Sequence, residues 1–301
     1  MSQFRVRTDL AVEARDYIMD AEEGLRGIRV EEEQKGDIKT TTVFIETKNA
    51  SKAMGKPMGT YITVEAARLE ESDEDYHNCV AKNIAEKLRQ LMEDRKKEKS
   101  VLIVGLGNRE VTADALGPMV IDKLNITRHV VKEYGKAAFG KSLVHSISGV
   151  IPGVMAKTGM ESEEMVKGIV KETKPDLVIA VDALASRSTK RLNKTIQITD
   201  TGIHPGSGVG NYRNALIEEN IGVPVVAVGI PTVVAAATIV VDAIEEISKE
   251  TGADTYSKFV ERNTKTIGEL QNMFVTGKDV DAMIERLSYT LAMAINMAFE
   301  F

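Results

Sequence analysis

Two aspartates in the same local context are the residues of this sequence best suited to acid–base chemistry. Asp114 and Asp182 each begin an Asp-Ala-Leu tripeptide, downstream of the apolar runs VLIV at 101–104 and LVIAV at 177–181. Such runs are typical of strands buried on both faces of a parallel sheet, where ligands bind at the carboxyl ends of the strands. A single Asp there is more often a helix cap or a turn residue. The repeated position favours function, and we predict that both carboxylates face one crevice.

Paired carboxylates suit hydrolysis. Like charges held close together force one pKa upwards, so one Asp can donate a proton while the other activates water. Other nucleophiles are poorly placed, because the sequence lacks a G-x-S-x-G motif and Cys79 lies in an acidic stretch that we expect to be helical. A metal is the alternative use of the aspartates, with a histidine as a further ligand, although the sequence has no close histidine pair.

The glycine-rich loop at 200–211 is the candidate binding segment, and it carries His204, Gly206 and Gly208. Glycines allow a ligand to approach the backbone, whose N–H groups can hold a peptide or an oxyanion. A loop histidine is more often hydrogen-bonded to backbone than functional. Elsewhere, Gly105 and Gly107 do not complete a dinucleotide fingerprint, because a glutamate stands where its third glycine belongs.

Strands that alternate with helices must position these residues. We expect strands at 40–46, 60–65, 101–104, 142–148, 177–181, 195–199 and 223–228, and helices at 8–19, 75–95, 117–124, 161–172, 232–247 and 280–298. The segment 31–36 is interpreted as a charged turn and 47–59 as an exposed loop. This order predicts βαβ units and an α/β fold of three layers, α/β/α, around a mostly parallel sheet.

Composition excludes several classes of protein. The 301 residues are 43% hydrophobic, which supports a sizeable core, and the net charge of −6 with interspersed signs argues against nucleic-acid binding. No apolar run is long enough to span a membrane, and the amino terminus lacks the apolar core of a signal peptide. We expect a single domain, with a helix and a small β appendage at about 10–97 leading into an α/β core at about 98–301.

Five stretches of the sequence resemble the germination proteases of endospore-forming bacteria, the Gpr endopeptidases. They are GLGNREVTADALGP, IPGVMAKTGMES, KPDLVIAVDALASRS, TIQITDTGIHPGSGVGN and VPVVAVGIPTVV, and the likeness runs from RTDLAVEA to the last helix. The resemblance implies a fold related to hydrogenase-maturation endopeptidases, phosphorylase/hydrolase-like in its layers. It also implies essential aspartates at Asp114 and Asp182, with no cofactor or metal.

The resemblance carries further expectations about biology. Members of this family cleave small, acid-soluble spore proteins early in germination, in the cytoplasm of the forespore and spore core. They are made as zymogens, assemble as homotetramers and remove their own propeptides. The apolar stripe of the last helix, with Met283, Leu287 and Leu291, is a candidate subunit interface.

The amino terminus looks like a substrate of such an enzyme. Relatives cut after an acidic residue and before a large apolar one, with a small residue and a second acid further on. Asp9, Leu10, Ala11 and Glu13 match this pattern, so we predict self-cleavage between Asp9 and Leu10, releasing a propeptide of residues 1–9 from a peptidase domain of residues 10–301. The simpler interpretation, a helix start capped by Thr8 or Asp9, is compatible with it.

Two alternatives remain open at this point. One is a metal-dependent peptidase on the same scaffold, with Asp114, Asp182 and His204 as ligands. The other is a binding module without catalysis that holds an extended peptide along the glycine-rich loop.

Overall fold

A computed structural model gives the structure of the protein and describes residues 8–19, 26–92, 98–140, 144–206, 214–251, 259, 262–270 and 272–300. Within these ranges nine strands form one sheet, in the order β1-β2-β3-β7-β8-β6-β4-β5, with β9 paired to β8. Their bounds are β1 Ile28–Lys35, β2 Ile38–Ile45, β3 Gly59–Ala66, β4 Ser100–Gly105, β5 Ser146–Val150, β6 Leu177–Ser186, β7 Thr195–Thr199, β8 Val225–Ala235 and β9 Phe274–Val275.

The prediction of a mostly parallel sheet is wrong, because the sheet is mixed. Strands β5, β4, β6 and β8 are parallel, as βαβ units require, but β7 runs antiparallel to β8 and β3. Strands β1, β2 and β3 then continue the same sheet as antiparallel hairpins. The residues taken for a small appendage therefore extend the central sheet itself, and antiparallel pairs outnumber parallel ones among the described strands.

Two segments interpreted as irregular are regular. Residues 31–35 belong to β1, whose charged side chains lie on both faces of an exposed edge strand. Charges on an edge are tolerated because they discourage pairing with other chains. Residues 47–59 contain helix α2 (Lys48–Met54), which Thr47 caps by accepting from the N–H of Ala50. Strand β8 also continues to Ala235, so the helix predicted from residue 232 begins later.

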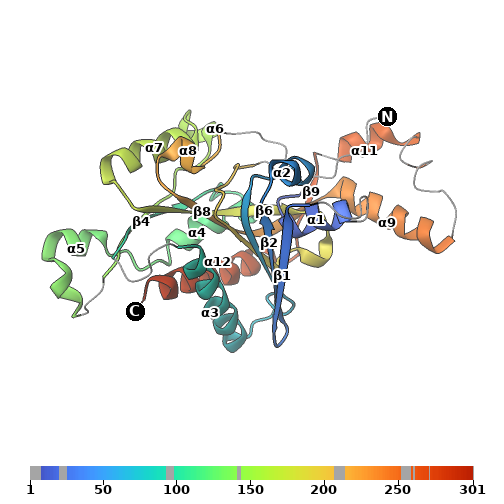
Figure 1. The fold of residues 1–301 in the computed structure, drawn as a ribbon. Coiled ribbons are helices and arrows are strands. Elements are labelled where there is room, and N and C mark those ends of the chain that lie inside the picture. Colours follow the sequence, from blue (N-terminus) through green and yellow to red (C-terminus); the bar gives the residue numbers. More distant parts are fainter. Residues whose placement is uncertain are drawn as a thin grey trace.

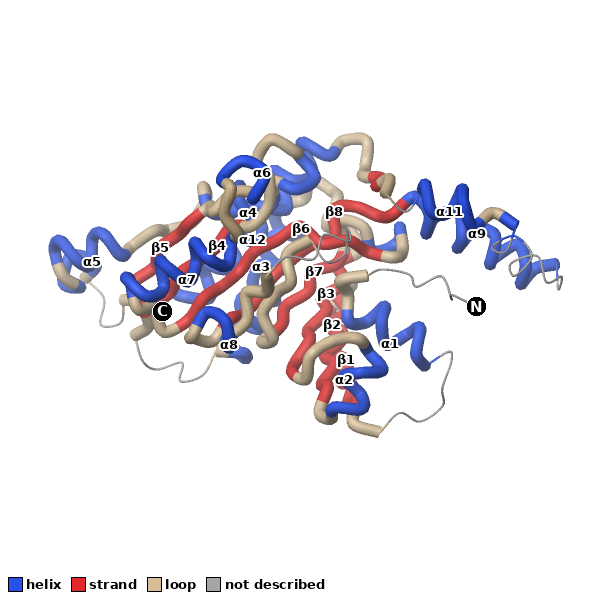
Figure 2. Tube along the Cα trace, turned by 90° about the horizontal axis from the view of Figure 1, so that it is seen from above, coloured by secondary structure: helices blue, strands red, loops and turns tan. Residues whose placement is uncertain are grey.

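Helices cover both faces of the sheet, as predicted for an α/β fold (Figures 1 and 2). Helices α3 (Glu74–Leu91), α4 (Leu116–Ile121) and α12 (Val280–Phe299) share the larger core on one face. Helix α7 (Ser162–Thr173) and the short α8 (Glu218–Ile221) pack on the other face of β4 and β6, and α1 (Ala11–Met19) and α2 on that face of β2 and β3.

The remaining described elements are shorter helices and turns and the helices that follow β8. They are α5 (Arg128–Tyr134), α6 (Met155–Thr158), α9 (Ala236–Thr251), α11 (Thr264–Leu270) and the 3₁₀ turns η1 (Thr112–Asp114), η2 (Lys136–Phe139) and η3 (Thr189–Arg191). Helices α9 and α11 project from the end of the sheet opposite α5 (Figure 2). No helix in the described part of the chain is long and apolar enough to cross a membrane.

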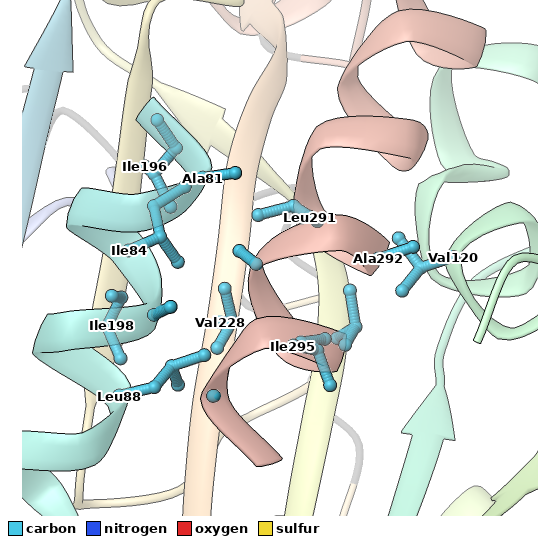
Figure 3. Packing of buried hydrophobic residues seen from close by; sticks show 14 of the residues in the cluster. Ala81, Ile84, Leu88, Val120, Ile196, Ile198, Val228, Leu291, Ala292 and Ile295 are labelled. Atoms are coloured by element: carbon cyan, nitrogen blue, oxygen red, sulfur yellow. The ribbon is translucent and has the colours of Figure 1, made fainter. Parts of the chain in front are cut away.

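The larger core explains the apolar stripe of the last helix. Met283, Leu287 and Leu291 are 8%, 0% and 0% exposed, and all three belong to the cluster that α12 forms with α3, α4 and the sheet. Figure 3 shows Leu291 and Ile295 in this packing, beside the sheet residue Val228. This stripe is buried within the chain itself, so it is not the subunit interface that we considered.

Candidate active site

Asp114 is carried by a loop that is fixed to the sheet at the end of β4. The chain leaves β4 at Gly105, and the N–H of Leu106 donates to the carbonyl of Val181 on β6 at 2.8 Å. Turn η1 then packs against β6 and β8. The buried hydroxyl of Thr232 on β8 donates to the carbonyl of Ala113 at 2.6 Å. These two bonds hold the residue before Asp114 and the start of the loop against neighbouring strands.

The loop folds back on itself around Asp114. The N–H of Asn108 donates to Asp114 Oδ2 at 2.7 Å, and the N–H of Asp114 donates to the carbonyl of Val111. Gly107 has a φ of 110°, and a Cβ built there would lie 2.0 Å from the carbonyl oxygen of Asp114. Only glycine allows this approach, so Gly107 is required by the position of Asp114.

Asp182 lies inside β6 rather than after it, because β6 stays paired with β8 as far as Ser186. Its position relative to β4 follows from the register of the two strands. Gly105, the last residue of β4, pairs with Val181, so Asp182 is the first residue of β6 beyond the end of β4. It is 6% exposed and accepts from the N–H of Ala183 at 3.0 Å.

The two aspartates therefore flank the same corner of the sheet. From Asp182 onward β6 has no strand on its β4 side, and the Leu106–Asp114 loop lies there, joined to β6 at Val181. Side chains of β6 alternate between the faces, since Val178 and Ala180 pack towards α7 while Ile179 and Val181 pack towards α12. Asp182 follows this alternation onto the α7 face.

The glycine-rich loop is only partly described. His204 is exposed, and Gly206 adopts a φ of 73°, whereas Gly208 lies outside the described residues. Ile203, just before His204, bridges to Leu216 and packs against the cluster that contains Leu184 of β6. In the described residues no group of three or more His, Cys, Asp or Glu side chains is arranged to hold a metal ion.

Comparison with known proteins gives a clear match for the chain as a whole. Residues 7–267 match the family model described as germination protease, peptidase A25. The chain belongs to the germination protease family. A germination protease of Caldanaerobacter subterraneus subsp. tengcongensis is 45% identical, over 98% of this chain and 94% of the relative. Those of Clostridium acetobutylicum and Bacillus velezensis are each 41% identical, covering 98% and 96% of this chain and 95% and 80% of theirs.

Membership confirms the resemblance drawn from the sequence motifs and makes the chain an endopeptidase of the germination type, acting on protein substrates.

The amino-terminal segment of this germination protease packs against the strand that carries Asp182. The segment from Thr8 to Glu13 lies across the carboxyl-terminal part of β6, on the α7 face. Leu10 is fully buried and packs with Val12 and with Leu184, two residues beyond Asp182 on the same strand.

Asp9 is hydrogen-bonded through both its backbone and its side chain. Its N–H donates to the carbonyl of Ala185 at 3.1 Å, and its Oδ2 accepts from the N–H of Ala185 at 2.9 Å. The carbonyl of Asp9 accepts from Lys56 Nζ at 2.8 Å and from Gln197 Nε2 at 2.8 Å. The Asp9–Leu10 bond, which we predicted to be cleaved, is thus held by hydrogen bonds against the strand that carries Asp182.

Glu13 anchors the other end of the segment. It is 4% exposed, and its carboxylate accepts from the N–H groups of Arg187 and Ser188 at 2.8 and 3.0 Å. It also accepts from the Thr8 hydroxyl, and the guanidinium of Arg191 lies 3.6 Å away. Both carboxylate oxygens of Glu13 therefore have hydrogen-bond partners, which compensates for the burial of its charge.

Sequence reasoning missed the groups that hold this segment, chiefly Lys56 and Gln197. Gln197 gave a usable signal, because it is a long amide between Ile196 and Ile198 in an apolar strand, and a buried polar group needs partners. Lys56 gave none, since it follows α2 in a stretch of ordinary surface composition.

Proposed function

We propose that Asp114 and Asp182 are the catalytic pair of this germination protease. The observation that supports the proposal is the corner at the end of β4, where the η1 loop meets β6 beside Asp182 and the Asp9–Leu10 bond lies across the same strand. Both carboxyls are held by backbone N–H groups, so neither has to be reoriented for each turnover.

The chemistry follows from two carboxyl groups at one corner. One carboxylate takes a proton from a water molecule as that water attacks the carbonyl carbon, and the other carboxyl donates a proton to the leaving amine. This mechanism requires the two carboxyls to differ in protonation, and two like charges held close together favour such a difference because they repel.

The substrates that we propose are small, acid-soluble spore proteins, and the first substrate is the chain itself. Cleavage between Asp9 and Leu10 would release residues 1–9 as a propeptide and leave a peptidase domain of residues 10–301, in the forespore and later the spore core. The burial of Leu10 against Leu184 supports a zymogen in which the bond is already docked. We further propose a homotetramer, assembled through surfaces other than the buried stripe of α12, and kinship with hydrogenase-maturation peptidases.

The test compares Asp114→Asn and Asp182→Asn with a matched control, Asp176→Asn. Asp176 is an exposed aspartate at the opposite end of β6, where it accepts from the N–H of Ser100. We expect each active-site variant to lose about 10²–10⁴-fold in the rate of cleavage of a spore-type protein, measured by mass spectrometry of fragments. The control should keep its rate, and circular dichroism should show all three folded.

Retained cleavage in either Asn variant would remove that aspartate from the mechanism. Treatment with a chelator, followed by metal analysis, separates the aspartate pair from a metal-dependent peptidase on the same scaffold. The aspartate pair predicts unchanged cleavage after metal has been removed.

A further inference from the structure

We infer that Lys56 and Gln197 are the oxyanion-binding pair for hydrolysis of the Asp9–Leu10 bond, and that the same two donors bind the carbonyl of the acidic residue at the cleavage point in protein substrates. This inference rests on the proposed self-cleavage, and it assigns catalytic groups that stand apart from the two aspartates.

The geometry around the Asp9 carbonyl carries the inference. Two side-chain donors, an ammonium and an amide, reach one backbone oxygen, each at 2.8 Å. Donors at this distance, held in a partly buried site, can stabilise the oxyanion that forms in peptide hydrolysis. A carbonyl that only ends a turn before a helix needs one partner, and it could take that partner from water.

Gln197 holds the backbone on both sides of Leu10. Its Nε2 donates to the carbonyl of Asp9, and its Oε1 accepts from the N–H of Ala11 at 2.5 Å. The side chain is 7% exposed and its residue is fixed in β7 by pairing with Thr63 and Gly229. A single amide therefore fixes the segment through main-chain atoms alone, which any substrate can offer.

Lys56 brings the positive charge to the same oxygen. Burial of its ammonium end lowers the pKa of Lys56, whereas the charges of Asp9 and Glu13 act in the opposite direction. The ammonium also lies 6.0 Å from the centre of the Tyr61 ring. A partly buried cation beside a carbonyl gains in interaction as negative charge develops on the oxygen, because less water screens it than at an exposed site.

The step balances without any further reactant. The oxygen of a water molecule bonds to the carbonyl carbon of Asp9, and the electron pair of the C=O bond moves onto the oxygen that Lys56 and Gln197 hold. When that pair returns, the C–N bond to Leu10 breaks. One active-site carboxylate takes the proton that the attacking water loses, and the other carboxyl supplies a proton to the leaving nitrogen. Asp9 thereby gains a carboxyl group, and Leu10 becomes a free amino terminus. Departure of residues 1–9 frees both donors for the acidic residue of a protein substrate.

Gln197→Glu and Lys56→Met test the pair. The glutamate keeps the size of the side chain and the acceptor for Ala11, but it replaces the donor to Asp9 by an oxygen. We expect each variant to lose about 10²–10³-fold in self-cleavage rate, and in kcat for an acidic peptide in the matured enzyme, with a smaller change in KM. Lys56→Arg should recover part of the rate. Lys52→Met, which removes an exposed lysine of α2, is the matched control and should cleave normally.

A second measurement reports the carbonyl directly and does not depend on turnover. Asp labelled with ¹³C at the carbonyl and Leu labelled with ¹⁵N give correlation peaks only for Asp–Leu pairs, of which the sequence has two, Asp9–Leu10 and Asp176–Leu177. In the inactive Asp182→Asn background, Gln197→Glu and Lys56→Met should each move the Asp9 carbonyl signal upfield. The Asp176 signal serves as the internal reference and should not move.

The possible outcomes distinguish failure of the oxyanion-binding pair from failure of the proposed self-cleavage. If the unaltered chain cleaves at Leu10 and Asp182→Asn does not, but Gln197→Glu and Lys56→Met both cleave at the normal rate, the oxyanion pair is wrong and the aspartate pair stands. A folded variant with lower stability but unchanged kcat and an unmoved Asp9 signal would assign Lys56 and Gln197 a merely structural role. Absence of cleavage at Leu10 in the unaltered chain would overturn both.

Discussion

Replacing Gly107 by alanine tests whether the position of Asp114 is set by backbone packing. The new Cβ would lie 2.0 Å from the Asp114 carbonyl oxygen, and real Cβ atoms essentially never approach closer than 3.0 Å. The neighbouring atom belongs to the backbone, so no side-chain rotation relieves the contact. Gly107 or the Asp114 turn must therefore shift by about 1 Å, a displacement that can cost an enzyme about 10²-fold in rate.

The effect on stability has two parts. A non-glycine residue at a φ of 110° costs about 1–3 kcal/mol, and the overpacked contact costs about 1–3 kcal/mol more. Gly222→Ala provides a control that separates them, because Gly222 has a φ of 87° and a Cβ there meets nothing within 4 Å. Gly222→Ala should lose only the stability that the unfavourable φ costs, and it should keep full activity.

The assay combines urea denaturation with initial rates of cleavage of a spore-type protein, measured at a temperature where both variants are folded. We expect Gly107→Ala to be the less stable of the two and to lose about 10²-fold in rate per folded molecule. A Gly107→Ala protein that matches Gly222→Ala in both stability and rate would refute the reasoning that the glycine sets the place of Asp114.

Two further predictions concern the core and pH. Leu291→Ala should lower the free energy of unfolding by about 2–5 kcal/mol, because Leu291 is fully buried. The control Tyr289→Ala, at a residue that is 59% exposed on the same helix, should change it by less than about 0.5 kcal/mol. Equal effects of the two substitutions in urea titrations would contradict the packing described for α12. Burial, with a smaller contribution from the charge of Lys99, lowers the pKa of His145. The unfolded chain therefore binds a proton at His145 more readily than the folded chain does. The free energy of unfolding should be highest above a pH of about 6.5 and should decrease as the pH falls below it. His145→Gln should reduce this dependence of stability on pH, whereas His129→Gln, at an exposed histidine, should not. An unchanged pH dependence in His145→Gln would exclude His145 as its cause.

Local patterns in the sequence were enough for the elements that carry the aspartates. The apolar runs at 101–104 and 177–181 form β4 and β6, and each is buried on both faces, as continuous β-branched runs predict. Gly105 and Gly107, at the end of β4 and just beyond it, indicated a loop there, and the loop does carry Asp114. The motifs around both aspartates also identified the family. These features are short-range, because propensity and burial pattern act over a few residues.

The direction of strands is a different matter, and the tertiary structure decided it. An alternating segment such as 195–199 pairs equally well in either direction, and only the connection across the molecule makes β7 antiparallel to β3 and β8. The amphipathic pattern of α12 had a similar ambiguity. It shows that one face is buried, but a stripe buried against the chain's own core looks the same as one buried against a partner.

The surroundings of the amino-terminal segment lay furthest beyond the reach of the sequence. Lys56, Ala185 and Gln197 meet at Asp9 from three separate elements, and Gln197 is 188 residues away in the chain. The pattern at residues 9–13 predicted a substrate-like segment, which depends only on the order of residue types. Which groups hold it depends on how β6, β7 and the end of α2 come together, and that arrangement is fixed by long-range packing of the sheet rather than by any local preference.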